Sequence, residues 1–200
     1  MIKKLYIGID PDLRLLNAAI VTDQKQALAV FKRSNKGLSG DKAVAQATGH
    51  VKGMVQDIYC CLATLEEHLD PECKVVTIVE SQNMEHTRKM REKGIPIPYQ
   101  KILIVGQIAG VLMGALSSIS NKVVLVQPRE WKGTIAKKIC HNRYYTALGL
   151  THNPGKKLKN IYPNNIESLS YYSQDKINPG DFMDINDSLG LALYGAKKNL

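Results

Sequence analysis

Short apolar runs separated by turn residues dominate the first part of the chain. Residues 3–9 are apolar and β-branched and stop at an Asp-Pro-Asp turn signal. Residues 14–22 and 26–33 form two further runs that only a short polar stretch separates. Connections this short predict three consecutive antiparallel strands, which form a meander.

A different spacing of apolar positions begins at Asp41. From there to about Leu69 the apolar residues recur with helical period, and we expect this helix to end at Asp70-Pro71. Residues 74–79 then form a continuous apolar run that is typical of a strand buried on both faces. The other predicted elements are a helix over 100–119, a strand over 122–126, a basic helix from Pro128 and a final helix from Asp184 to Lys198.

Two polar segments interrupt this series. Residues 81–98 end in Pro-Ile-Pro and predict a loop, and residues 151–180 predict a long irregular connection rich in Asn, Tyr, Lys and Pro. A meander followed by alternating helices and strands predicts an α/β layered fold with a mixed sheet. We therefore expect one domain over 1–200, with an elaboration at about 151–180.

The helix over 100–119 allows two interpretations. Residues 102–119 carry no formal charge, and Gly106, Gly110 and Gly114 repeat the spacing found in packed membrane helices. Gln107, two serines and a barely sufficient length favour instead a buried helix whose glycines face a sheet or a second subunit.

The amino-acid composition indicates which kinds of molecule the protein binds. Of the 200 residues, 44% are hydrophobic, so a buried core is available, and the net charge of +9 indicates an acidic partner. Nucleic acid is the first candidate and an anionic membrane the second.

The cysteines point to a reducing compartment. Cys60, Cys61, Cys73 and Cys140 form no C-x-x-C pair, and the spacing of Cys140, His141 and His152 fits no common zinc site. We expect four free thiols, no signal peptide and a cytoplasmic location.

Acidic residues stand where predicted elements begin or end. Asp10 closes the first strand, Glu80 closes the fourth, and Asp184 and Asp187 share one face at the start of the last helix. If the first and fourth strands are parallel neighbours, Asp10 and Glu80 lie side by side at their carboxyl ends. Converging carboxylates repel one another, and divalent ions such as Mg²⁺ or Mn²⁺ relieve that repulsion.

Each acid also has a simpler explanation. Asp10 fits a turn or a helix N-cap, and Glu80 fits the first solvated residue after a buried strand. Asp184 and Asp187 fit acids that compensate a helix dipole. The conjunction of all four, in this order and in a basic protein, favours a metal site.

The acids stand within a series of short motifs. The motifs are Gly8-Ile9-Asp10-Pro11-Asp12, Val79-Glu80-Ser81-Gln82, Gly106-Gln107-Ile108-Ala109-Gly110, Gln127-Pro128-Arg129-Glu130-Trp131-Lys132-Gly133 and Asp184-Ile185-Asn186-Asp187-Ser188. This ordered set resembles the RuvC-type Holliday-junction resolvases of the RNase H-like superfamily.

The resemblance implies a fold, a reaction and an assembly. The fold would be an RNase H-like three-layer α/β/α arrangement with a mixed five-stranded sheet. Asp10, Glu80, Asp184 and Asp187 would be catalytic and would bind Mg²⁺, with Mn²⁺ able to substitute. A homodimer would cut branched DNA by hydrolysis and leave 5′-phosphate and 3′-hydroxyl ends.

The basic residues form two clusters that fit DNA backbone binding. Residues 127–176 hold nine lysines and arginines against three acids. The candidate DNA contacts there are Arg129, Lys132, Lys137, Lys138 and Arg143, of which Lys132 and Lys137 would lie near the active site. A second cluster, with Arg88, Lys89 and Arg91, follows Glu80. A solvated basic face remains the alternative for both clusters.

The chain departs from the family pattern after Glu80. Cellular members of the family tend to carry an aromatic wedge there, whereas this chain has Asn83 and Met84. Tyr162, Tyr171 and Tyr172 are candidates to supply the missing stacking. Other RNase H-like nucleases, acting on RNA–DNA hybrids, flaps or forks, and a non-catalytic DNA-binding module of the same fold remain alternatives.

Overall fold

The sheet contains the predicted meander and the predicted parallel strands. The computed structural model describes residues 1–11, 15–34, 41–81, 84–97, 99–135, 137–149, 170–173 and 182–200, with side chains except at 34, 41–47, 84–87, 100, 101, 137, 138, 170–173 and 182–184. The strands are β1 (Ile2–Pro11), β2 (Leu15–Thr22), β3 (Ala27–Ser34), β4 (Leu69–Glu80), β5 (Lys122–Val126) and β6 (Ser170–Ser173).

The strand order is β5-β4-β1-β2-β3-β6. Strands β1, β2 and β3 pair antiparallel, while β4 pairs parallel to β1 and β5 parallel to β4. The predicted α/β class and mixed sheet are thus confirmed. The four-residue β6 adds a parallel strand to the β3 edge. No strand was expected there from the sequence, because a run this short carries no periodic signal.

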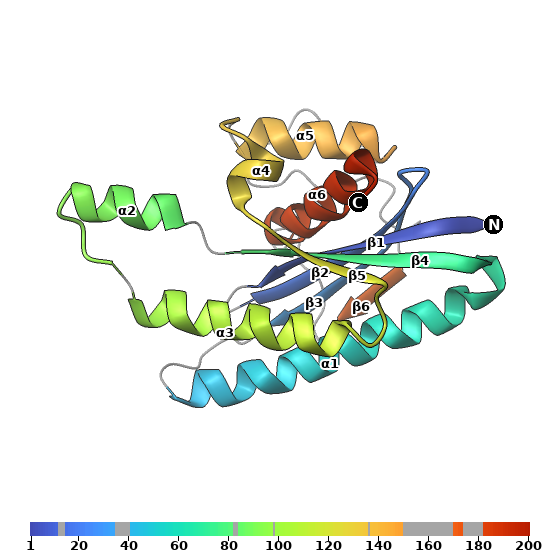
Figure 1. The fold of residues 1–200 in the computed structure, drawn as a ribbon, viewed down its shortest axis with the longest axis horizontal. Coiled ribbons are helices and arrows are strands. Elements are labelled where there is room, and N and C mark those ends of the chain that lie inside the picture. The colour runs from blue at the N-terminus through green and yellow to red at the C-terminus, as the bar shows by residue number, and fades with distance from the viewer. Residues whose placement is uncertain are drawn as a thin grey trace.

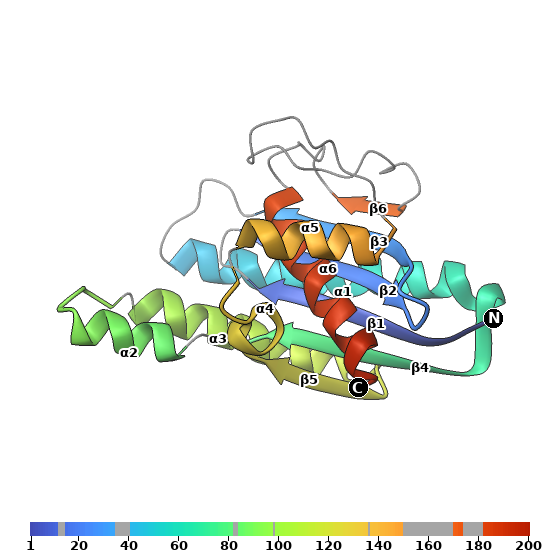
Figure 2. The same ribbon diagram turned by 90° about the horizontal axis from the view of Figure 1, so that it is seen from above.

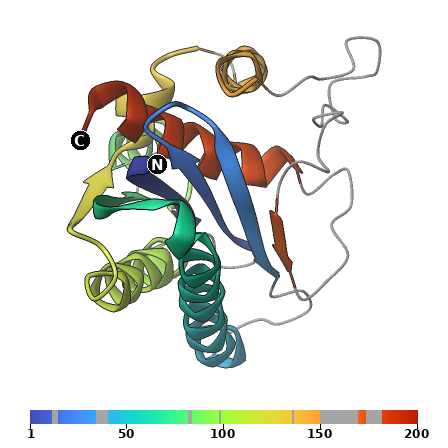
Figure 3. The ribbon, with the colours of Figure 1, turned by 90° about the vertical axis from the view of Figure 1, so that its right-hand side faces the viewer.

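Helices cover both faces of the sheet, which gives three layers (Figures 2 and 3). The helices are α1 (Asp41–Leu65), η1 (Glu66–His68), α2 (Met84–Glu92), α3 (Tyr99–Leu116), α4 (Pro128–Lys132), α5 (Lys137–Ala147) and α6 (Phe182–Lys198). Helices α1 and α3 pack with one face of the sheet in one hydrophobic core, and α4, α5 and α6 pack with the other face in a second core.

The largest differences from the predicted elements lie before and after β4. Helix α1 ends at Leu65, and β4 begins at Leu69, so Asp70-Pro71 lies inside the strand. The predicted loop over 81–98 contains α2, which projects from the end of β4 (Figure 1). Its sequence is rich in helix-forming Met, Glu, Lys and Arg but lacks an apolar stripe, so the hydrophobic pattern could not reveal it.

Helix α3 is buried on one side only. Ile108, Ala109 and Leu112 pack into the core beneath the sheet, whereas Leu103 and Val111 are exposed. Gly106, Gly110 and Gly114 face open space rather than the sheet, because a Cβ built on each would meet no atom within 4 Å. Among the described helices, none is long and apolar enough to cross a membrane.

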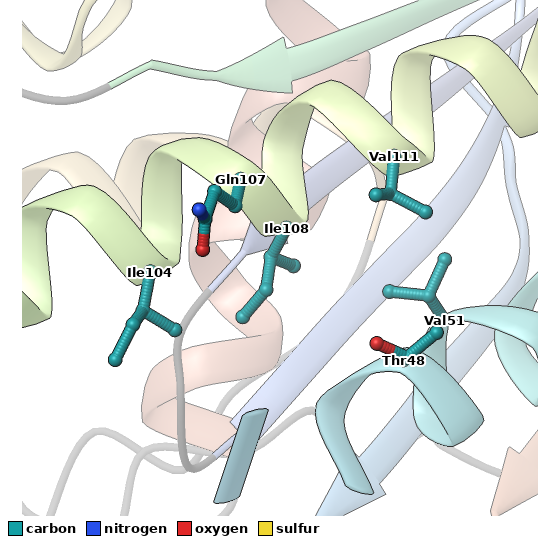
Figure 4. Close-up of a pocket in the computed structure, with 6 residues that line it drawn as sticks. All are labelled: Thr48, Val51, Ile104, Gln107, Ile108 and Val111. Atoms are coloured by element: carbon teal, nitrogen blue, oxygen red, sulfur yellow. The ribbon is translucent and has the colours of Figure 1, made fainter. Parts of the chain in front are cut away.

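An apolar groove lies between α3 and α1 (Figure 4). It lies in the layer formed by α1 and α3, on the opposite side of the sheet from α6. The groove is lined by Thr48, Val51, Ile104, Gln107, Ile108 and Val111.

A glycine in β1 determines how closely α6 approaches the sheet. A Cβ at Gly8 would collide with backbone atoms of Ser188 and Ala192 in α6. Backbone atoms cannot swing aside as side chains can, so any larger residue must displace the helix. The close contact fixes the height of α6 above β1 and therefore positions the residues that α6 carries.

We predict that Gly8→Ala lowers the free energy of unfolding by about 3 kcal/mol, the upper end of typical overpacking costs. Urea unfolding measures the effect. Gly49→Ala is the matched control, because an added Cβ there meets no atom within 4 Å and replaces an exposed helical glycine. The control should gain about 0.5–1 kcal/mol. An unchanged stability for Gly8→Ala would contradict the packing argument.

Candidate active site

The parallel pairing of β1 with β4 brings two predicted site residues together. Ile9 is in register with Val79, so Asp10 and Glu80 follow on adjacent strands at the same edge of the sheet. Both side chains are partly buried there. The sequence-based expectation that these two acids lie side by side agrees with the observed register.

Helix α6 contributes a third acid. Asp187 is 4% exposed and lies one residue before Ser188, whose carbonyl contacts Gly8 of β1. The close approach of α6 to β1 therefore places Asp187 near the sheet edge. Asp184 belongs to the first turn of α6, but its side chain lies outside the described part of the structure.

Lys132 forms ion pairs with two of these acids. Its Nζ lies 3.1 Å from Asp187 Oδ2 and 3.3 Å from Glu80 Oε2. Burial alone would lower the pKa of Lys132, but Asp187 and Glu80, with a smaller effect of Asp10, outweigh it and raise the pKa above its ordinary value. The ammonium therefore stays charged and neutralises a cluster of carboxylates.

The local structure of α4 explains how Lys132 reaches this position. Helix α4 starts directly after β5, with Gln127 and Glu130 forming a reciprocal capping box and Pro128 in the first turn. The capped turn points Trp131 and Lys132 toward the end of β4. Both residues come from the basic motif after the fifth strand, but Lys132 binds acids here, whereas a phosphate contact was predicted.

Trp131 fixes Glu80 from the other side. Its Nε1 donates a hydrogen bond of 2.9 Å to Glu80 Oε2, and its ring lies 4.5 Å from Lys132 Nζ. The indole also packs at 5.8 Å from the ring of Tyr144. Gly190 of α6 makes room for both rings, since a Cβ there would overlap them. Sequence reasoning did not select Trp131 as a site residue.

Burial has the largest effect on the pKa of Glu80. Loss of solvent raises the pKa of Glu80, Lys132 opposes this effect, and the negative charge of Asp187 adds to it. The net pKa lies above the ordinary glutamate value. An ionised Glu80 is therefore costly to the fold unless a cation compensates it.

Asp187 has a second partner on α5. His141 Nε2 lies 3.1 Å from Asp187 Oδ1, and both side chains are almost fully buried. In the sequence, His141 stands out only beside Cys140 and His152, at a spacing that fits no common zinc site, and His152 lies outside the described residues. All four cysteines are free, as predicted.

The residue types fit a divalent cation, but their present arrangement holds an ammonium. Carboxylate oxygens are the ligands that Mg²⁺ and Mn²⁺ prefer. Asp10, Glu80 and Asp187 are arranged around Lys132 instead, and among the described side chains no group of three acids, histidines or cysteines is placed to hold a metal ion directly.

The other predicted DNA contacts lie on the surface or outside the described side chains. Arg129 of α4, Arg143 of α5 and Arg88, Lys89 and Arg91 of α2 are exposed. Arg88 Nε lies 3.5 Å from Glu92 Oε1 within α2. Lys137 and Lys138 begin α5, and Tyr171 and Tyr172 lie in β6, without described side chains. Asn83 and Tyr162 lie outside the described residues, and Met84 begins α2.

Comparisons with known proteins identify the fold. No protein-family model and no curated protein matches the chain. The structure is similar to RuvC from Thermus thermophilus bound to a Holliday junction, at 15% identity and a TM-score of 0.55, over 98% of this chain and 96% of that one. A second structure of Thermus thermophilus RuvC gives a TM-score of 0.52 at the same identity and coverage.

At this identity the similarity establishes an RNase H-like fold. A human cytomegalovirus terminase nuclease domain also matches, at 13% identity and a TM-score of 0.45, over 98% of this chain and 83% of that one. The predicted three-layer α/β/α architecture is confirmed by the observed layers and by the RuvC structures.

The raised pKa of Glu80 predicts a pH-dependent stability. A carboxyl group with a raised folded pKa stabilises the fold below its unfolded pKa, and this contribution is lost as pH rises through the folded pKa. Glu80→Gln removes the loss, so its stability relative to wild type should be greater at pH 7 than at pH 4. Urea unfolding at both pH values measures this, with the exposed Glu66→Gln as control. An equal effect at both pH values would contradict the assignment.

Proposed function

We propose that this protein is a metal-dependent, structure-selective endonuclease that resolves Holliday junctions or other branched DNA. The convergence of Asp10, Glu80 and Asp187 from β1, β4 and α6 on one cationic group carries this proposal. Three separate elements place acids there at a cost in electrostatic free energy, which indicates function rather than stability.

The acids would hold Mg²⁺, with Mn²⁺ able to substitute. Asp10, Glu80 and Asp187 supply hard oxygen ligands, and Asp184 begins the same helix as Asp187. When bound, the metal would activate water and stabilise the charge that develops on the phosphodiester. Lys132 would then be released from Asp187 and Glu80 and would be available to bind a DNA phosphate.

Exposed basic residues flank this edge of the sheet and support a DNA substrate. Arg129 and Arg143 lie on the α4 and α5 side, while Arg88, Lys89 and Arg91 lie on the projecting α2. Contacts of this kind read the backbone and shape of DNA rather than its sequence. Binding should accordingly weaken steeply as salt rises.

We predict that Asp10→Asn and Glu80→Gln each reduce Mg²⁺-dependent cleavage of a labelled four-way junction more than about 100-fold. Changes to groups that only support metal ligands already cost 10–100-fold, so loss of a ligand should cost more. Junction binding without metal should persist, as measured by gel shift. Glu66→Gln, an exposed acid in η1, is the control and should cleave like the wild type.

A substrate panel distinguishes the alternatives. Junction, fork, flap, RNA–DNA hybrid and linear duplex are incubated with the wild type and Mg²⁺. Preferential cleavage of hybrid, flap or fork would assign the chain to another kind of RNase H-like nuclease. Binding without cleavage, together with no Mn²⁺ uptake in calorimetry, would indicate a non-catalytic DNA-binding module.

The two symmetric cuts of junction resolution call for a homodimer, and α3 supplies a suitable surface. Gly106, Gly110 and Gly114 face open space beside the exposed Leu103 and Val111. The apolar groove between α1 and α3 continues this surface (Figure 4). Small residues in such a row allow two helix backbones to approach closely.

We predict that Gly110→Arg converts a dimer into a monomer without loss of fold, because the position is open in one chain but crowded between two. Size-exclusion chromatography with light scattering measures the mass, and circular dichroism checks the fold. Glu66→Arg, on the exposed η1, should remain dimeric. A Gly110→Arg variant that stays dimeric would remove α3 from the interface.

A further inference from the structure

The two oxygens of Asp187 have different kinds of partner. Oδ2 faces Lys132 and Glu80, where the proposed cation site lies. Oδ1 faces away from it, toward His141 on α5. His141, which has no role in the proposed chemistry, thus contacts the carboxylate oxygen that points away from the proposed cation site.

His141 begins a buried chain of hydrogen bonds between α5 and α6. Its Nε2 lies 3.1 Å from Asp187 Oδ1, and its Nδ1 lies 3.3 Å from Asn186 Nδ2. Asn186 Oδ1 in turn accepts a hydrogen bond from the hydroxyl of Tyr145. His141 and Tyr145 lie one helical turn apart on α5, while Asn186 and Asp187 are consecutive on α6.

The hydrogen bond from Tyr145 to Asn186 determines which atom donates in each of the other two hydrogen bonds. Because the Tyr145 hydroxyl donates to the amide oxygen of Asn186, the Asn186 amino group faces His141. An amino group can only donate, so Nδ1 of His141 must accept and carries no proton. The ring proton therefore lies on Nε2 and is donated to Asp187 Oδ1.

Burial makes this chain rigid. Tyr145, His141, Asn186 and Asp187 are 1%, 3%, 2% and 4% exposed, so water does not compete for the hydrogen bonds. A hydrogen bond in such surroundings is stronger than one at the surface, and breaking one leaves a buried polar group unpaired. The chain thus fixes the rotation of the Asp187 carboxylate.

We propose that His141 is a positioning residue for the cation site, supported by Asn186 and Tyr145. By holding Asp187 Oδ1, it keeps Oδ2 directed toward Glu80 and the ion. This inference rests on the proposed function, since it concerns how well the same site binds a divalent cation.

The first test compares two tyrosines. Tyr145→Phe removes the hydroxyl that orients Asn186, whereas Tyr59→Phe removes an exposed hydroxyl on α1, which covers the opposite face of the sheet. Mn²⁺ affinity is measured by titration calorimetry on variants whose urea unfolding confirms the fold. We expect Tyr145→Phe to weaken Mn²⁺ binding by about 10-fold and Tyr59→Phe to leave it unchanged.

Substitutions of His141 should change the Mn²⁺ affinity more, and a conservative substitution should restore most of it. His141→Ala should weaken Mn²⁺ binding by up to about 100-fold. His141→Gln retains an amide that can donate to Asp187, so its Mn²⁺ affinity should lie within about 10-fold of wild type. A structural role alone would lower stability in both variants without this difference in affinity.

A second measurement examines the hydrogen bonds between α5 and α6 in the metal-free protein. Long-range ¹⁵N spectra should show that Nδ1 of His141 accepts a hydrogen bond and that the proton shared with Asp187 lies on Nε2. A proton on Nδ1 would overturn the proposed series of hydrogen bonds even if Mn²⁺ binds.

The outcomes separate this inference from the function on which it rests. An Mn²⁺ affinity that is the same in the wild type, Tyr145→Phe, Tyr59→Phe and His141→Ala would overturn the positioning role and leave the nuclease proposal intact. Absence of Mn²⁺ uptake by the wild type would overturn both.

Discussion

The structure around the carboxyl edge of the sheet depends on the compensation of converging negative charge. Asp10, Glu80 and Asp187 come from three elements, and without a cation their repulsion and desolvation would oppose the packing of α6 on β1. The Lys132 ammonium provides this compensation, at 3.1 Å from Asp187 and 3.3 Å from Glu80. The fold therefore tolerates a charge arrangement that is unfavourable by itself and that the proposed function would use to bind a divalent cation.

Small residues make this arrangement geometrically possible. Gly8 allows backbone contact between β1 and α6, and Gly190 leaves space for the rings of Trp131 and Tyr144. Trp131 then reaches Glu80 through its Nε1. Close helix–sheet packing and the position of the carboxylates are consequently one feature, because moving α6 outward would move Asp187 with it.

Much of the fold and part of the site could be predicted from local sequence signals. The meander and the strands that carry Asp10 and Glu80 near their carboxyl ends follow from apolar runs with clear endings. Helix α2 escaped prediction because it buries no apolar stripe, and β6 because it is only four residues long. The roles of Trp131 and His141 could not be inferred, since their partners, Glu80 and Asp187, lie 51 and 46 positions away along the chain.

The sequence by itself determined which acids end the buried strands, because alternation of apolar and polar residues is a local property. It also determined the excess of basic residues. Only the tertiary structure decided that Lys132 faces carboxylates rather than solvent, and that Asp187 lies within hydrogen-bond distance of His141, which in turn contacts Asn186. Side-chain direction depends on how α4, α5 and α6 dock on the sheet, and that docking is a sum of many long-range contacts that no local pattern records.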